Sequence, residues 1–202
     1  MRFTLATSNL HKRDEIGAIL TALGISPVEI QTLRDLPHIA SPAEDGDSFF
    51  ENARIKALAV SSAVDGCVLA DDSGLEADAL NGRPGIHSAR YAGEGASSEE
   101  CVQKLLRETA GVPRQNRSAR FVCVMVLARG KEILAEARGV CEGYIAEAPA
   151  GSGGFGYDPV FWLPEYRRTM AEIPQAEKNR ISHRADALKR LEKPLRAALR
   201  LS

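Results

Sequence analysis

The run Cys67-Val68-Leu69-Ala70, followed at once by Asp71-Asp72-Ser73-Gly74, constrains the fold of this chain more than any other segment. A short apolar run bounded by polar residues is typical of a fully buried strand. In open α/β sheets the ligand sites lie at the carboxyl ends of such strands. The segment therefore predicts a buried strand that ends at Asp71 and delivers polar groups there. Asp-Ser-Gly is also ordinary turn chemistry, so a simple turn is the alternative interpretation.

Strand-like and helix-like segments follow one another along the chain without strict alternation. Further strands are predicted at residues 2–6, 27–32, 119–128 and 133–141, the last two forming a hairpin through Arg129-Gly130-Lys131. Helices are predicted at residues 10–23, at 47–63, from the capping box Ser97-Ser98-Glu99-Glu100 to about 109, and from Ser182 onward, with a kink or restart at Pro194. We expect an α/β protein with a mixed twisted sheet flanked by helices, as one domain over residues 1–202 with two lobes around a central cleft.

The composition excludes several classes of protein. The 202 residues carry 26 Lys plus Arg against 27 Asp plus Glu, and 44% are hydrophobic. Such a balance is typical of a globular protein rather than a disordered one, and it argues against a nucleic-acid polymer as partner. The apolar run at the N-terminus is too short for a signal peptide or a membrane span. The four cysteines are widely spaced among apolar residues, which predicts free buried thiols and a cytoplasmic protein.

A first candidate site is the strand-to-helix junction Thr7-Ser8-Asn9-Leu10-His11-Lys12. The N-terminus of a helix attracts phosphate through its free N–H groups and its partial positive charge. Lys12 adds a full charge, and Thr7 and Asn9 can donate hydrogen bonds. The alternative is that Ser8 or Asn9 only caps the helix and Lys12 is a solvated surface residue.

A second candidate site is the acidic pair Asp71-Asp72. Adjacent carboxylates repel each other unless a cation or several donors neutralise them. Mg²⁺ does so with one or two carboxylates and keeps positions for water and phosphate. Glu44 and Asp45 could complete a metal site, although the sequence spacing alone favours a solvated loop. Lys56, on the following helix, would usually be an exposed surface residue and becomes important only if its face points into the cleft.

A third group of candidates lies toward the C-terminus. Gly151-Ser152-Gly153-Gly154-Phe155-Gly156 matches GxGxxG by accident, because Tyr157-Asp158-Pro159 and not a helix follows it. A loop that presents Phe155 as a stacking surface for a flat base is the better interpretation, with Phe155 packed in the core as the alternative. Lys178 is followed by His183 and Arg184, which could donate to a base carbonyl or a phosphate, although a His-Arg pair in the first turn of a helix is usually an exposed surface pair. Positive charge at a helix start is unfavourable, so Arg184 is expected to have a compensating partner.

Taken together in this order, the motifs closely resemble the inosine triphosphate pyrophosphatase family. The markers are Ala6-Thr7-Ser8-Asn9 with Lys12, Ser48-Phe49-Phe50-Glu51-Asn52-Ala53 with Lys56, Ala70-Asp71-Asp72-Ser73-Gly74-Leu75, Pro84-Gly85-Ile86 with Ser88-Ala89-Arg90-Tyr91, Gly154-Phe155-Gly156-Tyr157-Asp158-Pro159, Ala176-Glu177-Lys178 and Ser182-His183-Arg184. They extend over nearly the whole chain. One departure is Ser8, where bacterial relatives often carry Gly.

The resemblance implies an elongated fold, a homodimer, a Mg²⁺ requirement and hydrolysis of dITP, ITP or XTP to the monophosphate and pyrophosphate. It implies Asp72 as the proton acceptor and Glu44, Asp71 and Asp72 as the acidic positions associated with the metal. The substrate-binding residues that it implies are Thr7, Ser8, Asn9, Leu10, His11, Lys12, Lys56 and Ser73 for the triphosphate, and Phe155, Gly156, Tyr157, Asp158, Lys178, His183 and Arg184 for the nucleoside.

Three other functions compete with this hypothesis. A pyrophosphatase for modified pyrimidines shares the broad architecture, but the His183-Arg184 motif and the Phe155 loop favour purines. A phosphatase with an aspartyl nucleophile would need a DxD spacing, which Asp71-Asp72 lacks. A nucleotide sensor without catalysis would not need both Asp72 and Lys12. Donors at His183 and Arg184 suit a 6-keto oxygen and not the 6-amino group of adenine, and guanine would have to be rejected near position 2.

Overall fold

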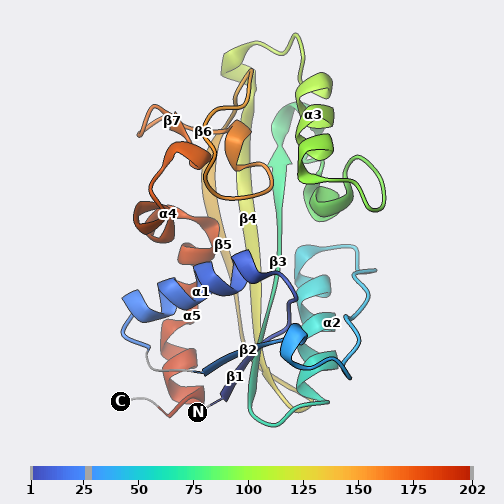
Figure 1. Ribbon diagram of the computed structural model, residues 1–202, viewed down its shortest axis with the longest axis vertical. Coiled ribbons are helices and arrows are strands. Elements are labelled where there is room, and N and C mark those ends of the chain that lie inside the picture. The colour runs from blue at the N-terminus through green and yellow to red at the C-terminus, as the bar shows by residue number, and fades with distance from the viewer. Residues whose placement is uncertain (1, 26–28, 201–202) are drawn as a thin grey trace. The chain divides into compact units, whose positions relative to one another are not determined.

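The computed structural model describes residues 2–25 and 29–200 and shows a mixed α/β fold (Figure 1). Within those residues the strands form one seven-stranded sheet in the order β2-β1-β3-β4-β5-β6-β7. The strands are β1 (Arg2–Leu5), β2 (Glu29–Thr32), β3 (Cys67–Ala77), β4 (Ser118–Arg129), β5 (Glu132–Ile145), β6 (Phe161–Leu163) and β7 (Arg168–Thr169). The α-helices are α1 (Leu10–Ala22), α2 (Phe49–Ser61), α3 (Ser98–Glu108), α4 (Gln175–Ile181) and α5 (His183–Ala198). The sheet is mixed because β1 pairs in parallel with β2 and β3, whereas β6 pairs antiparallel with β5 and β7.

The chain divides into two compact units. The first comprises Met1–Asp72, Cys123–Gly139 and Arg184–Ser202, and the second comprises Ser73–Val122 and Val140–His183. The strands β3, β4 and β5 are each divided between the two units, with one part in the first and the other part in the second. The boundary inside β3 falls between Asp72 and Ser73.

The first unit has a core between its sheet strands and two helices. Fully buried side chains of α1 and α5 pack against those of β1, β3 and β4; they include Ile16, Ile19, Leu20, Leu188, Leu191, Phe3, Leu69 and Met125. Helix α2 lies on the opposite side of these strands from α1 and α5 (Figure 1). Helix α1 begins behind the N-cap Asn9, and Gly24, with a φ of 70°, follows its end. A glycine at this position adopts the left-handed conformation at little cost, which explains why the helix stops there.

The second unit has its own core. It is formed by the second half of β3, the first half of β4, helix α3 and the segment around β6; it includes Leu75, Leu105, Phe121, Val160 and Phe161. The capping box predicted at the start of α3 is present, since Ser97 accepts from the Glu100 N–H and Glu100 accepts from the Ser97 N–H. This reciprocal pairing satisfies two backbone donors that a helix start would otherwise leave open.

Most predicted elements are confirmed, and two predictions need correction. The strand that was expected to end at Asp71 continues to Ala77, so Asp71-Asp72-Ser73-Gly74 is not a turn. Pro194 lies inside α5 and does not restart it. The last helix begins at His183, directly after Ser182, as predicted, whereas the short helix α4, which ends just before Ser182, was not predicted. Of the strand predicted at residues 27–32, residues 27 and 28 lie outside the described part of the chain.

The hairpin of β4 and β5 and the four free, buried cysteines are confirmed; all four cysteines lie in the described part of the chain. Among residues 2–25 and 29–200, none of the helices has both the length and the apolar character that crossing a membrane requires.

Candidate active site

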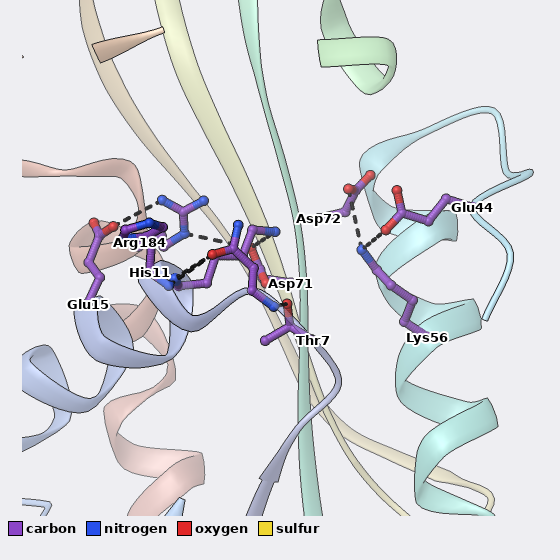
Figure 2. Close-up of polar contacts among 10 residues, drawn as sticks. Thr7, His11, Glu15, Glu44, Lys56, Asp71, Asp72 and Arg184 are labelled. Atoms are coloured by element: carbon purple, nitrogen blue, oxygen red, sulfur yellow. Dashed lines mark hydrogen bonds and ion pairs between the residues drawn. The ribbon is translucent and has the colours of Figure 1, made fainter. Parts of the chain in front are cut away.

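The two adjacent carboxylates of β3 point to opposite faces of the sheet. Successive residues of a strand alternate between its faces, and β3 continues straight through Asp71 and Asp72. Asp71 faces α1 and the start of α5, whereas Asp72 faces α2 (Figure 2). The pair therefore does not need one shared cation, because each carboxylate has its own cationic partners.

Asp71 is buried in a network of ion pairs. Its Oδ2 lies 2.8 Å from Lys12 Nζ and 3.7 Å from Arg184 Nε. Arg184 Nη1 in turn donates to Glu15 Oε2 at 3.2 Å. Burial alone would raise the pKa of Asp71, but the charges of Lys12, Arg184 and Lys56 outweigh it and hold that pKa below its ordinary value. Arg184 thus has the compensating partners that its place at a helix start requires.

Asp72 belongs to a second cluster, on the α2 side. Lys56 Nζ donates to Glu44 Oε1 at 2.6 Å and lies 3.5 Å from Asp72 Oδ1 (Figure 2). Burial raises the pKa of Asp72, and the negative charges of Glu44 and Asp71 add to that effect, so that Lys56 and Lys12 compensate it only in part. Burial would lower the pKa of Lys56, yet its acidic neighbours keep that pKa raised, so Lys56 stays charged.

Lys56 reaches this cluster because of its position on α2. It is 5% exposed and lies on the same helix face as the buried residues Phe49, Asn52, Ala53, Ala57 and Val60. These positions follow the three- and four-residue spacing of a helix face that packs inward. Lys56 is therefore a buried residue and not an exposed one of the helix surface.

The start of α1 is arranged differently from a fully open anion site. Asn9 Oδ1 accepts hydrogen bonds from the backbone N–H groups of His11 at 2.9 Å and Lys12 at 3.2 Å, and Thr7 Oγ1 accepts from Asn9 N–H. Asn9 is the N-cap, as one of the two interpretations predicted. The first turn contains no acidic residue, so the positive end of the helix and the Lys12 ammonium still favour an anion here.

Within the described residues, no group of three or more His, Cys, Asp or Glu side chains is arranged to hold a metal ion. Of the three acidic positions expected at a metal, Glu44 and Asp72 meet at the same ammonium, while Asp71 points to the other face. Two carboxylates that converge on one cation form a donor set that suits Mg²⁺, which commonly binds only one or two carboxylates. The residues present therefore fit such an ion at Glu44 and Asp72.

In the second unit, Asp158 organises the glycine-rich loop. Its Oδ2 accepts from Phe155 N–H at 2.8 Å and from Lys178 Nζ at 2.6 Å. Gly154 has a φ of 73°, and a Cβ there would lie 2.0 Å from Asp158 Oδ2, so this position requires glycine. The loop leads into a 3₁₀ turn and β6, which confirms that its GxGxxG match is accidental.

The aromatic and basic candidates of the second unit are brought partly together. Lys178, buried on α4, places Nζ 5.0 Å from the centroid of the half-buried Phe155 ring. Tyr157 is buried and donates to the carbonyl of Ser88 at 2.8 Å. His183 stacks on Phe121 with ring centroids 4.8 Å apart. Tyr157 and Asp158 thus hold the loop, and Phe155 and Lys178 form one pair.

The remaining candidates are not fully buried. Ser8 and His11 are exposed, Leu10, Ser73 and Gly156 are half-buried, and the Ser8 carbonyl accepts from Arg34 Nε at 2.8 Å.

Two buried polar residues were not among the candidate site residues, although Asn52 stands within one of the family markers. Glu15, 3% exposed, holds Arg184, and Asn52, fully buried, lies one turn before Lys56. Both stand at helical spacing from buried apolar residues, Glu15 four before Ile19 and Asn52 eight before Val60. A polar residue inside an apolar stripe was the signal that could have revealed them.

Comparison with known proteins identifies the family of this chain. A family model described as the Ham1 family matches residues 3–194. The chain belongs to this family.

Its relatives are similar over almost their whole length. A dITP/XTP pyrophosphatase of Geobacillus kaustophilus is 51% identical over 93% of this chain and 91% of the relative, and one of Halalkalibacterium halodurans is 49% identical over 94% and 96%. Among solved structures, a HAM1 protein from Coxiella burnetii is 38% identical with a TM-score of 0.86, covering 98% of this chain and all of the other. The Ham1 protein of Staphylococcus aureus is 36% identical with a TM-score of 0.83, covering 98% and 99%.

Proposed function

We propose that this protein hydrolyses the deaminated purine nucleoside triphosphates dITP, ITP and XTP to the nucleoside monophosphate and pyrophosphate, and so removes them from the nucleotide pool. The names of the relatives that are about half identical support this substrate class. The observation that carries the proposal is the buried cluster of Asp72, Lys56 and Glu44, since it combines a carboxylate of raised pKa with a charged ammonium. A base and a cation held together are what attack on a phosphoric anhydride requires.

The triphosphate is bound by the cationic groups of the first unit. Lys12 and Lys56 each supply a full positive charge, and the N-terminus of α1 adds a partial one. The other residues that we assign to the triphosphate lie at that helix start, namely Thr7, Ser8, Asn9, Leu10 and His11. Ser73, which follows the acidic pair on β3, belongs to the same group. Binding of an anion would draw Lys12 away from Asp71, and Arg184 then remains to neutralise that carboxylate.

A bound Mg²⁺ would be held by Glu44 and Asp72 and would supply positive charge to the phosphate oxygens and the developing charge of the leaving group. Asp71, on the other face of β3, stays outside this metal site and keeps its ion pair with Arg184. Lys56 keeps the two carboxylates of the metal site together before the ion arrives.

In the reaction, the oxygen of a water molecule forms a bond to a phosphorus, and the bridging P–O bond between the α and β phosphates breaks. Asp72 orients this water and accepts its proton, and a positioned base of this kind contributes about 10²–10⁴-fold to the rate. The electron pair of the broken bond leaves with the departing phosphate group. Lys12 and Lys56 stabilise the negative charge that accumulates on the phosphate oxygens.

The nucleoside is bound by residues of the second unit and the start of α5. Phe155 offers a surface for stacking, and Asp158 and Lys178 fix the loop that carries it. His183 and Arg184 donate to the 6-keto oxygen of hypoxanthine or xanthine, whereas adenine would place a donor against these donors. We expect guanine to be rejected near position 2, because a mismatch there strands a buried polar group.

Two further statements belong to the same proposal. The protein acts in the cytoplasm, where deaminated nucleotides arise and where four free, buried thiols remain reduced. It acts as a homodimer, as its family resemblance implies. Mass determination in solution at micromolar concentration would contradict this state if it returned only the monomer.

The test is a panel of ITP, dITP, XTP, GTP, ATP and dUTP with Mg²⁺, in which pyrophosphate and orthophosphate are detected separately. We expect pyrophosphate from the first three and little from the others. Asp72→Asn serves as the matched control for contaminating activity. Equal turnover of GTP and ITP would overturn the proposed base selection, and preferred turnover of dUTP would favour a pyrimidine enzyme. If ITP bound without release of pyrophosphate, and bound equally well to Asp72→Asn, the result would favour a nucleotide sensor.

A further inference from the structure

A buried amide on α2 is not explained by the proposed catalytic roles. Asn52 is fully buried in the first turns of the helix, and its Oδ1 accepts a hydrogen bond from the backbone N–H of Gly46 at 2.9 Å. Its Nδ2 has no hydrogen-bond partner among the described residues. A buried amide left half satisfied costs about 1–3 kcal/mol. A residue retained at such a cost is expected to have a function beyond packing.

The partner of Asn52 lies in the loop that carries Glu44. A Cβ placed on Gly46 would lie 2.7 Å from the Cβ of Glu51 and 3.0 Å from Asn52 Oδ1. The backbone of this loop is therefore in direct contact with the first turn of α2. Asp47 N–H also donates to Glu51 Oε2 at 2.7 Å, but Glu51 is exposed to solvent. Asn52 supplies the buried attachment.

This attachment stands two residues from the carboxylate of the proposed metal site. Glu44 belongs to a segment without helix or strand, and its side chain is 35% exposed. It nevertheless lies 2.6 Å from Lys56 Nζ, on the same helix as Asn52 and one turn further along. We propose that Asn52 is a positioning residue that, through the N–H of Gly46, holds the Glu44 carboxylate at Lys56 and Asp72. This inference rests on the proposed function of that cluster.

Two substitutions remove the same attachment from opposite sides. Asn52→Ala deletes the acceptor, and Gly46→Ala forces the loop away from it. We expect each to lower kcat for ITP by roughly tenfold or more, because a small misplacement of a catalytic group has effects of this size. The Mg²⁺ concentration at half-maximal rate should rise, while KM for ITP stays within about threefold, since the phosphate-binding groups are unchanged.

The decisive measurement is a double-mutant cycle with Glu44→Gln. If Asn52 acts through Glu44, Asn52→Ala lowers kcat little further once Glu44 is already altered. Ser61→Ala is the matched control, because Ser61 is equally buried on α2 but bonds the Gly130 carbonyl at 2.6 Å at the other end of the helix. The Ser61→Ala substitution should lower the melting temperature without changing kcat or the Mg²⁺ concentration at half-maximal rate.

Two outcomes would overturn the inference. One is an equal loss of kcat from Asn52→Ala with and without the Glu44→Gln change. The other is unaltered amide exchange at residues 44–47 in Asn52→Ala, because a loop that has lost its attachment must exchange faster. The exchange measurement needs no activity, so it tests the attachment even if the wild-type protein fails to hydrolyse any of the triphosphates, a result that would contradict only the proposed function.

Discussion

At the scale of single residues, the two neighbouring aspartates have opposite electrostatic surroundings, although they are chemically identical. Asp71 is surrounded by more positive than negative charge, and its pKa is lowered. Asp72 is buried beside Glu44 and Asp71 as well as Lys56, and its pKa is raised. A pKa difference between the folded and unfolded states is a contribution to stability, so the same substitution at the two positions is expected to have opposite effects.

Asp72→Asn should make the metal-free protein as stable as the wild type or more so, while it loses activity. A raised pKa means that the folded state binds the proton more tightly, so the ionised form opposes folding as the pH rises above about 3.9. We therefore expect an equal or higher melting temperature in EDTA at pH 7 and a kcat lower by about 10²–10⁴-fold. In the wild type, kcat should fall at acid pH, where protonation of Asp72 removes the base and competes with Mg²⁺. A clearly lower melting temperature of the variant would contradict this account.

Asp71→Asn should instead destabilise the protein. A carboxyl of lowered pKa stabilises the folded state above about pH 3.9, and this contribution disappears as the pH falls through the pKa of the folded state. Removing one charge from a buried ion pair costs about 3 kcal/mol, or a melting temperature lower by about 6–12 °C. Thermal unfolding at pH 7 and at pH 3 measures both effects, because the difference between wild type and variant must shrink in acid. An undiminished difference at pH 3 would show that the charge of Asp71 is not its cause.

At the scale of elements, the sequence predicts what is encoded locally. The capping box at Ser97 and Glu100 and the glycine that follows α1 are short-range signals, and both are confirmed. The continuation of β3 beyond Asp71 could not be predicted, since it depends on pairing with strands distant in the sequence. The opposite orientation of Asp71 and Asp72 follows from that continuation. The local sequence therefore suggested one cation shared by the two carboxylates, whereas each has its own cationic partner.

Helix α5 shows how packing overrides a local signal. Pro194 lacks the N–H that a helix interior needs, and the sequence predicts a kink or a restart there. Leu191 and Leu195, on either side, are almost completely buried in the core of the first unit. Their burial stabilises the helix across the proline. Intrinsic helix propensities do not include this tertiary contribution, so the sequence could not predict it.

The glycine-rich loop can be tested as an element by two alanine substitutions. Gly154 and Gly156 both have positive φ, but only Gly154 has no space for a Cβ, because Asp158 Oδ2 and Lys178 Nζ would lie 2.0 and 3.1 Å away. Gly156→Ala should cost only the backbone strain of about 1–2 kcal/mol. Gly154→Ala should in addition displace Asp158 and Lys178 and raise KM for ITP about tenfold or more. Equal effects of the two substitutions on KM and melting temperature would contradict a role of the Asp158 contacts.

At the scale of the whole molecule, a formal net charge of −1 conceals charges that are sorted locally. The first unit concentrates Lys12, Lys56 and Arg184 around Asp71, Asp72 and Glu44. Most of these side chains are buried, where each uncompensated charge costs several kcal/mol. A ligand that brings both a divalent cation and phosphate groups would complement the carboxylates and the ammonium groups at once, so ligand binding and folding stability are expected to be coupled.

This coupling predicts that Mg²⁺ and a triphosphate stabilise the protein together. A ligand at about one hundred times its Kd adds about 2.7 kcal/mol to the free energy of unfolding, or about 5–11 °C to the melting temperature of a chain of this size. We expect this rise with an ITP analogue whose α,β-bridging oxygen is a methylene group, so that no hydrolysis occurs. Glu44→Gln should lose the part of the rise that depends on Mg²⁺ and keep the part that the analogue produces in EDTA, since Lys12 and Lys56 remain. An unchanged Mg²⁺ dependence in Glu44→Gln would exclude this carboxylate as a ligand of the ion.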